Sequence, residues 1–219
     1  MNILIISPHP DDETLGAGGT ALRLLSQGHN VYWLNITCID NFSPATQEQK
    51  DKRYAQIEAI KAFYNFTDSF DLKMPTTELD TISDSEGISR ISDIINKVKP
   101  EWIILPNPSD IHSDHKQVFN WCFSCTKVFR YPFIKKILTM EIPSETDFAN
   151  SDNAFVPNMF VDITPYMDKK LDAIQIYESE IMPHPFPRSL ENIKALATIR
   201  GATAGVVYAE GFRIIKEIF

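Results

Sequence analysis

Ser7-Pro8-His9-Pro10-Asp11-Asp12-Glu13-Thr14 joins two predicted elements near the start of the chain. Before it, Asn2 to Ile6 is a short apolar run that predicts a buried strand, and after it Thr14 to Gln27 predicts a helix. One histidine and three carboxylates therefore lie in the turn that follows the first strand. In open α/β sheets ligands bind outside the carboxyl ends of the strands, so this turn is a candidate site.

Strands and helices are predicted to alternate along residues 1–130, which indicates a doubly wound, mainly parallel sheet. We expect an α/β fold, a three-layer αβα sandwich, in one domain over residues 1–219. Residues 131–219 are expected to complete the sheet and to wall the site. The predicted strands cover residues 2–6, 31–37, 69–72, 102–105, 136–142, 159–163 and 208–215. The predicted helices cover residues 14–27, 44–64, 84–98, 116 to about 129, 164–179 and 189–200.

Composition excludes several classes of protein. The 219 residues are 43% hydrophobic and 23% charged, as in ordinary globular proteins, and carry a net charge of −8. No basic run appears, so we expect no nucleic-acid partner. We also expect no transmembrane segment, since no apolar stretch is long enough, and no signal peptide. Three cysteines do not suggest a disulfide framework, so the predicted location is the cytoplasm.

His9, Asp12 and His115 are the candidate metal ligands. His9 and Asp12 follow the first predicted strand, whereas His115 follows the strand at 102–105. In the usual strand order these two strands are neighbours, so both loops open into the same crevice. Two imidazoles and a carboxylate leave coordination positions open for water and substrate, as in zinc hydrolases and in iron(II) oxygenases.

Asp11, His112 and Asp114 are candidate catalytic residues beside that metal. A hydrolytic site needs a base for the attacking water and a donor for the developing oxyanion. Asp11 is adjacent to the candidate ligand Asp12 and suits the role of base. We predict that His112, three residues before His115, acts in its protonated form as a donor to the oxyanion or to the leaving amine. Asp114 is expected to orient His112 and to favour its charged form.

The two motifs together, Pro8-His9-Pro10-Asp11-Asp12-Glu13 and His112-Ser113-Asp114-His115, resemble those of the PIG-L/LmbE family of zinc-dependent N-deacetylases. The resemblance implies a Rossmann-like fold, Zn²⁺ held by the three candidate ligands, Asp11 as general base and His112 assisting at the tetrahedral intermediate. It implies substrates that carry N-acetylglucosamine, with acetate and a free amine as products. Further similar positions are Glu141 to Ser144, Pro157, Asn158, Asp162, Lys170, Tyr177, Ser179, Arg200, Gly201, Gly205 and Ala209 to Phe212.

Arg53, His184 and Arg188 are the candidate substrate-binding residues. Arginine suits the recognition of phosphate or carboxylate groups. Arg53 is near the start of the helix after the second strand and is expected to face the crevice. His184 and Arg188 belong to a proline-rich segment, Pro183-His184-Pro185-Phe186-Pro187-Arg188, that is typical of a wall or lid.

Two alternatives from other classes remain open. Gly16-Ala17-Gly18-Gly19-Thr20-Ala21 formally matches a dinucleotide-binding fingerprint. However, nine residues separate Ile6 from Gly16, whereas the true fingerprint follows its strand at once, so close helix packing is the favoured interpretation. The second alternative is a metal- or sugar-binding module without catalysis, and the presence of Asp11 argues against it.

Overall fold

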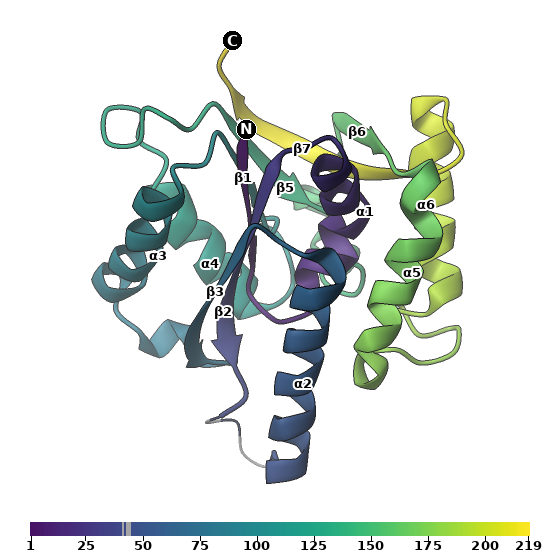
Figure 1. The fold of residues 1–219 in the computed structure, drawn as a ribbon, viewed down its shortest axis with the longest axis horizontal. Coiled ribbons are helices and arrows are strands. Elements are labelled where there is room, and N and C mark those ends of the chain that lie inside the picture. The colour runs from purple at the N-terminus through teal and green to yellow at the C-terminus, as the bar shows by residue number, and fades with distance from the viewer. Residues whose placement is uncertain (41, 43–44) are drawn as a thin grey trace.

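A seven-stranded sheet forms the centre of this computed structural model, which describes residues 1–40, 42 and 45–219 (Figure 1). The strand order is β3-β2-β1-β4-β5-β7-β6. The strands from β3 to β5 are mutually parallel, and β7 runs antiparallel to both β5 and β6. The strands are β1 (Asn2–Ser7), β2 (Asn30–Cys38), β3 (Asp68–Pro75), β4 (Trp102–Leu105), β5 (Lys136–Met140), β6 (Met159–Asp162) and β7 (Ala209–Glu217).

Helices cover both faces of the sheet, so the predicted αβα fold class is confirmed (Figure 1). Helices α3 and α4 pack on one face, and α1, α2, α5 and α6 lie on the other. Within the described ranges, none of the helices is long and apolar enough to cross a bilayer. The helices are α1 (Asp12–Ser26), α2 (Gln47–Tyr64), α3 (Asp84–Val98), α4 (Ser113–Ser124), α5 (Met167–Ile176) and α6 (Leu190–Ala204).

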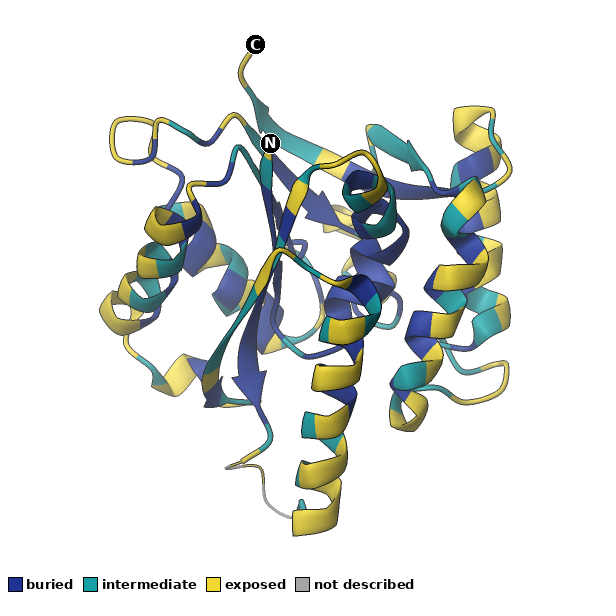
Figure 2. Ribbon diagram, in the orientation of Figure 1, coloured by how far each residue is buried: buried dark blue, intermediate teal, exposed yellow. Residues whose placement is uncertain are grey.

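The position of β1 in the middle of the sheet, covered on both faces, explains why its sequence is continuously apolar. Ile3 and Ile5 pack into the core beneath α1, whereas Leu4 and Ile6 pack into the core beneath α3 and α4. All four side chains have no exposed surface, and Figure 2 shows the middle of the sheet as buried. A strand that is covered on both faces needs apolar residues at every position rather than at alternate ones. The pairing of β1 with both β2 and β4 confirms the predicted neighbour relation.

Some helix boundaries differ from the prediction. Helix α4 ends at Ser124, before the predicted end at 129, and α6 continues to Ala204, where Gly205 caps it at φ 73°. The helix predicted over 164–179 is a short 3₁₀ turn followed by α5. Helix α2 begins after Thr46, whose side chain forms a capping box with Gln49. The predicted first residue, Pro44, lies outside the described residues.

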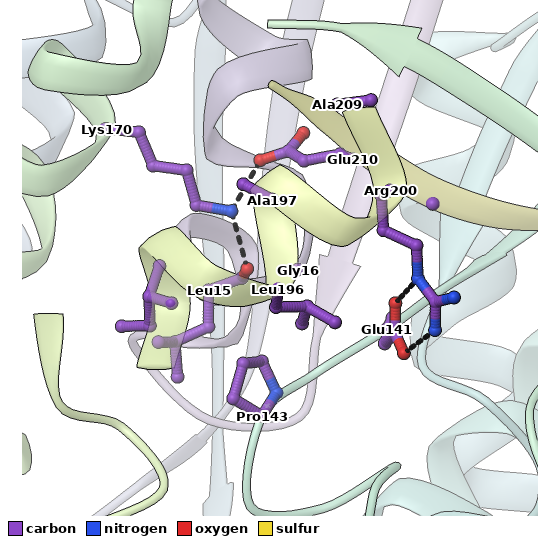
Figure 3. Close-up of a pocket in the computed structure, with 12 residues that line it drawn as sticks. Leu15, Gly16, Glu141, Pro143, Lys170, Leu196, Ala197, Arg200, Ala209 and Glu210 are labelled. Carbon is purple, nitrogen blue, oxygen red and sulfur yellow. Dashed lines mark hydrogen bonds and ion pairs between the residues drawn. The ribbon is translucent and has the colours of Figure 1, made fainter. Parts of the chain in front are cut away.

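A buried ion pair fixes α1 against β7 (Figure 3). The Lys170 ammonium donates to Glu210 at 2.6 Å and to the Leu15 carbonyl at 2.8 Å. The Glu210 carboxylate also accepts the backbone N–H groups of Gly19 and Thr20. Buried charges are tolerated only when they are paired and hydrogen-bonded, as they are here. The pair therefore sets the position of α1, whose first residues form the candidate site.

The glycine run lies inside α1 and not in a phosphate-binding loop. A Cβ at Gly16 would lie 2.7 Å from the Met140 sulfur, and one at Gly19 would lie 2.7 Å from Ile163. These glycines let the helix approach the sheet and β6 closely. The packing interpretation therefore replaces the dinucleotide fingerprint.

Candidate active site

The turn between β1 and α1 has an unusual backbone at Asp11. This residue is buried and adopts φ 133° and ψ −28°, a conformation that costs about 1–3 kcal/mol for a residue other than glycine. Its N–H donates to the Glu13 carboxyl at 3.1 Å, and Tyr177 donates to the same carboxyl at 2.9 Å. Burial raises the pKa of Glu13 to about 8. Glu13 and Tyr177 therefore hold the turn that presents Asp11 and Asp12.

His9, Asp12 and His115 converge at this turn with the spacing that a metal ion requires. His115 Nε2 lies 3.3 Å from Asp12 Oδ2 and 3.3 Å from His9 Nδ1. His9 Nδ1 lies 3.6 Å from the same Asp12 oxygen. Ligand atoms at zinc bond lengths of about 2.0–2.1 Å form a tetrahedron with edges of about 3.4 Å. The three atoms thus have the spacing of one triangular face of such a site.

Each histidine of this set is oriented by a carboxylate on its outer side. His115 Nδ1 lies 2.9 Å from Asp110, and His9 Nε2 lies 3.0 Å from Asp114. An imidazole that donates its outer N–H to a carboxylate presents the lone pair of its other nitrogen inward. Two lone pairs and one carboxylate oxygen therefore meet at one point, which is the donor set that a divalent cation needs.

The carboxylates around the set favour a positive charge at this point, which either protons on the histidines or a bound metal ion can supply. Burial disfavours a charged His9, yet hydrogen bonds with Asp114 and Asp12 raise its pKa to about 9. Burial likewise opposes the charge on His115, but Asp12 and Asp110 raise its pKa to about 10. The neighbouring histidines hold the pKa of Asp12 well below its usual range despite its burial. Asp12 Oδ1 is buried without a hydrogen-bond partner among the described residues.

A second set of ligand atoms, from His9, His112 and Asp114, also lies within 4.8 Å. However, His112 Nδ1 accepts the backbone N–H of Asp114 at 3.1 Å. The Asp114 carboxylate accepts the N–H of Thr77 at 2.7 Å as well as contacting His9. We favour the set with Asp12 and His115, because both of its histidines have a carboxylate on their outer side and their inner nitrogens face one Asp12 oxygen.

The role predicted for Asp114 needs correction. Its carboxylate contacts His9 and not His112, which is bound only through the Asp114 backbone N–H. Burial and the neighbouring His9 lower the pKa of His112 to about 4, although Asp114 opposes this shift. These surroundings favour a neutral His112 in place of the expected protonated one. Because its Nδ1 accepts a hydrogen bond, the neutral ring carries its proton on Nε2.

Asp11 lies beside the ligand set and is paired with Arg188. Arg188 Nη1 donates to Asp11 Oδ2 at 2.8 Å, while Asp11 Oδ1 is buried with no partner among the described residues. Burial raises the pKa of Asp11 to about 7, although Arg188 opposes the shift. A carboxyl group whose pKa is near neutrality and whose second oxygen is unpaired is suited to proton transfer.

A pocket of about 290 Å³ opens onto these residues. Arg53 and Arg188 line it, as predicted, but His184 does not. His184 is exposed and contacts Asn192 at 3.2 Å, so the proline-rich segment places only Arg188 at the pocket. The other residues of its wall are His9, Pro10, Asp11, Thr37, Ile39, Phe42, Thr76, Thr77, His112, Glu145 and Glu180.

Several residues that shape the site were not identified from the sequence. Asp110 accepts a hydrogen bond from Thr146 at 2.8 Å and so holds His115 from a buried position. Glu145 contacts Arg188. Asp110 could have been found as a carboxylate five residues before His115 in the loop after β4. Glu145 carries no such local signal, because it reaches the site from a distant loop.

We expect Asp110→Ala to weaken metal binding by about 10–100-fold, as is typical when the partner of a ligating histidine is removed. His115 loses the hydrogen bond that orients its ring, whereas the three candidate ligands remain. Metal affinity is measured by titration of metal-free protein with Zn²⁺ and a competing chelator. Asp93→Ala, at an exposed position of α3, is the control and should leave affinity unchanged. Equal affinities in the two variants would contradict the role of Asp110.

The fold and the site together define a class of protein. It is an α/β sandwich with a candidate hydrolytic metal centre where the strand order of the sheet reverses, between β1 and β4. The family model of PIG-L, GlcNAc-PI de-N-acetylase, matches residues 4–125, which is more than half of the chain. The chain therefore belongs to the PIG-L family and is an enzyme of the N-deacetylase class.

Individual relatives agree with this assignment. Diacetylchitobiose deacetylase of Thermococcus kodakarensis is 26% identical over 234 residues, covering 99% of this chain and 84% of the relative. The solved N,N'-diacetylchitobiose deacetylase from Pyrococcus horikoshii is 25% identical with a TM-score of 0.79, covering 98% of this chain and 84% of the other. GalB, the 4-carboxy-2-hydroxymuconate hydratase from Pseudomonas putida, is 19% identical with a TM-score of 0.77, covering 100% and 97%. This last likeness shows the fold alone.

Proposed function

We propose that this protein hydrolyses the N-acetyl group of an amino sugar related to N-acetylglucosamine and releases acetate and a free amine. The observation that carries the proposal is the convergence of His9, Asp12 and His115 beside the unpaired oxygen of Asp11. The similarity to diacetylchitobiose deacetylases over nearly the whole chain supports the substrate class.

PIG-L deacetylases are metal-dependent, and we propose Zn²⁺ for this chain. Two imidazoles and one carboxylate are a donor set that zinc accepts, with Fe²⁺ as the alternative. His9, Asp12 and His115 would hold the ion. When bound, the ion activates water and polarises the amide carbonyl. The site residues of this chain supply the remaining steps.

Asp11 is the proposed general base. Its unpaired Oδ1 takes a proton from the water that attacks the acetyl carbon, while Oδ2 stays bound to Arg188. Arg188 is itself held by Ser144 at 2.7 Å and by Glu145 at 3.2 Å, so the carboxylate keeps its direction. Asp11 then carries the proton that the departing amine requires.

His112 is the proposed donor to the developing oxyanion. Its Nδ1 is occupied by the Asp114 N–H, so its Nε2–H is the available donor. His112 lines the pocket and its ring centroid lies 4.6 Å from that of His9. A neutral donor that is already oriented stabilises negative charge without a change of protonation.

A reducing compartment such as the cytoplasm suits the chain. Cys38, Cys122 and Cys125 are buried and free, and Cys122 and Cys125 pack in the core beneath α4. Buried thiols of this kind need no disulfide partner and act as small apolar side chains.

The function is tested with the purified wild-type chain loaded with Zn²⁺. Acetate release is measured on N-acetylglucosamine, diacetylchitobiose and a sugar nucleotide that carries N-acetylglucosamine, together with the metal content. We expect acetate release that is lost after treatment with a chelator and restored by Zn²⁺. Full metal occupancy without acetate from any N-acetylated sugar would contradict the proposal and would favour a binding module.

A further inference from the structure

The pocket at the candidate metal site continues into a second pocket of about 590 Å³. This second pocket lies along α2 and the 3₁₀ turn Glu178–Glu180. Arg53 and Glu180 line both pockets, so their ion pair forms part of the wall that the two share. A substrate longer than one sugar that reaches the metal site would pass this pair.

Glu180 joins two guanidinium groups. One carboxylate oxygen pairs with Arg53, and the other lies 3.5 Å from Arg188 Nη1. Arg53 has no other carboxylate partner among the described residues, and its second contact is the Pro10 carbonyl at 3.3 Å. The Arg53 and Arg188 side chains are only 15% and 14% exposed, so solvent screens their charges weakly.

Every cation that lines the two pockets within the described part of the chain is already paired. Arg188 also pairs with Asp11 and Glu145, and Lys52 pairs with Glu178 at 2.8 Å. The pocket at the metal site therefore has three carboxyl groups and two guanidinium groups in its wall. Apart from the proposed metal ion, an anionic group entering it would meet no cationic side chain of the described residues without a carboxylate partner, and it would lie near carboxylates.

We propose that Glu180 determines specificity for neutral N-acetylated saccharides and against phosphorylated ones. The inference rests on the proposed deacetylase function and adds the substrate's charge to it. The Arg53–Glu180 pair neutralises the wall past which the sugar enters. Without the Glu180 carboxylate, Arg53 becomes an unpaired and weakly screened cation that binds phosphate.

The test compares Glu180→Gln with the wild type on two substrates, neutral diacetylchitobiose and anionic N-acetylglucosamine 6-phosphate. We expect the ratio of kcat/KM for the phosphorylated over the neutral sugar to rise by about tenfold to hundredfold, as for a hydrogen bond to a charged group. The wild type is expected to prefer the neutral sugar. Glutamine has the same shape and Glu180 is partly exposed on a short turn, so the core is not disturbed.

Two further variants sharpen the test. Glu178→Gln removes the same charge from the same turn, but the pair of Glu178 with Lys52 is exposed to solvent. We therefore expect the ratio of kcat/KM for the two sugars to change by less than twofold. Adding Arg53→Gln to Glu180→Gln should return the ratio to the wild-type value. An unchanged ratio in Glu180→Gln, an equal shift in Glu178→Gln, or a wild type that prefers the phosphorylated sugar would each overturn the inference.

Binding of inorganic phosphate separates this inference from the proposed function. Titration calorimetry on the zinc-loaded proteins should show about tenfold to hundredfold tighter phosphate binding by Glu180→Gln than by the wild type. The ion's own affinity for phosphate is common to both proteins. Tighter binding without acetate release by either protein would support Glu180's role and reject the deacetylase function. Acetate release with unchanged phosphate binding would support the deacetylase function and reject Glu180's role.

Discussion

Asp11→Asn is expected to lower kcat by about 10²–10⁴-fold while the bound metal stays at the wild-type level. The amide cannot take a proton from water, yet it preserves the size of the side chain and an oxygen that can accept from Arg188. Asparagine is also enriched at positive φ, so the backbone of the turn is maintained. Acetate release and zinc content are measured on the same preparation.

The control for this variant is Asp152→Asn, which makes the same change at an exposed position. It should retain full activity and full metal content. Parallel loss of zinc and turnover in Asp11→Asn would show that Asp11 is a metal ligand and not the base. Wild-type turnover in that variant would transfer the role of base to another group.

His115→Ala is expected to remove most of the bound zinc and, with it, the activity. The variant loses one of three converging ligand atoms. Its affinity for zinc should therefore fall by more than the 10–100-fold that is typical when only the hydrogen-bond partner of a ligating histidine is removed. Zinc is quantified by elemental analysis after dialysis, and the fold is checked by circular dichroism. The helix should persist, because His112 still caps α4 and Val118, Trp121 and Cys122 still pack in the core.

His184→Ala is the matched control, because it removes an exposed histidine that does not line the pocket. Its zinc content and activity should equal those of the wild type. Wild-type zinc stoichiometry in His115→Ala would exclude His115 as a ligand. The second set, with His112 and Asp114, would then be the candidate site.

The core of the fold and the candidate ligands could be predicted from short stretches of sequence. The apolar run of β1 and the polar turn after it specify a buried strand that ends at a crevice. The alternation of strands and helices then makes β1 and β4 neighbours, which brings His9 and His115 together although 106 residues separate them. Periodicity and topology suffice for this step, because each ligand lies in the loop or the first helical turn that comes after one of these two strands.

Only the three-dimensional structure revealed the partners of those residues. Arg188 reaches Asp11 across 177 positions of the chain, and Asp114 turns to His9 rather than to the nearer His112. Side-chain direction and the packing of distant loops decide such contacts, and neither leaves a periodic signal. The lowered pKa of His112 has the same origin, since burial and the neighbouring His9 act through space. The pattern of strands, helices and polar turns therefore predicted which residues gather at the site. Tertiary packing decided which partner each of these side chains contacts and which charge it carries.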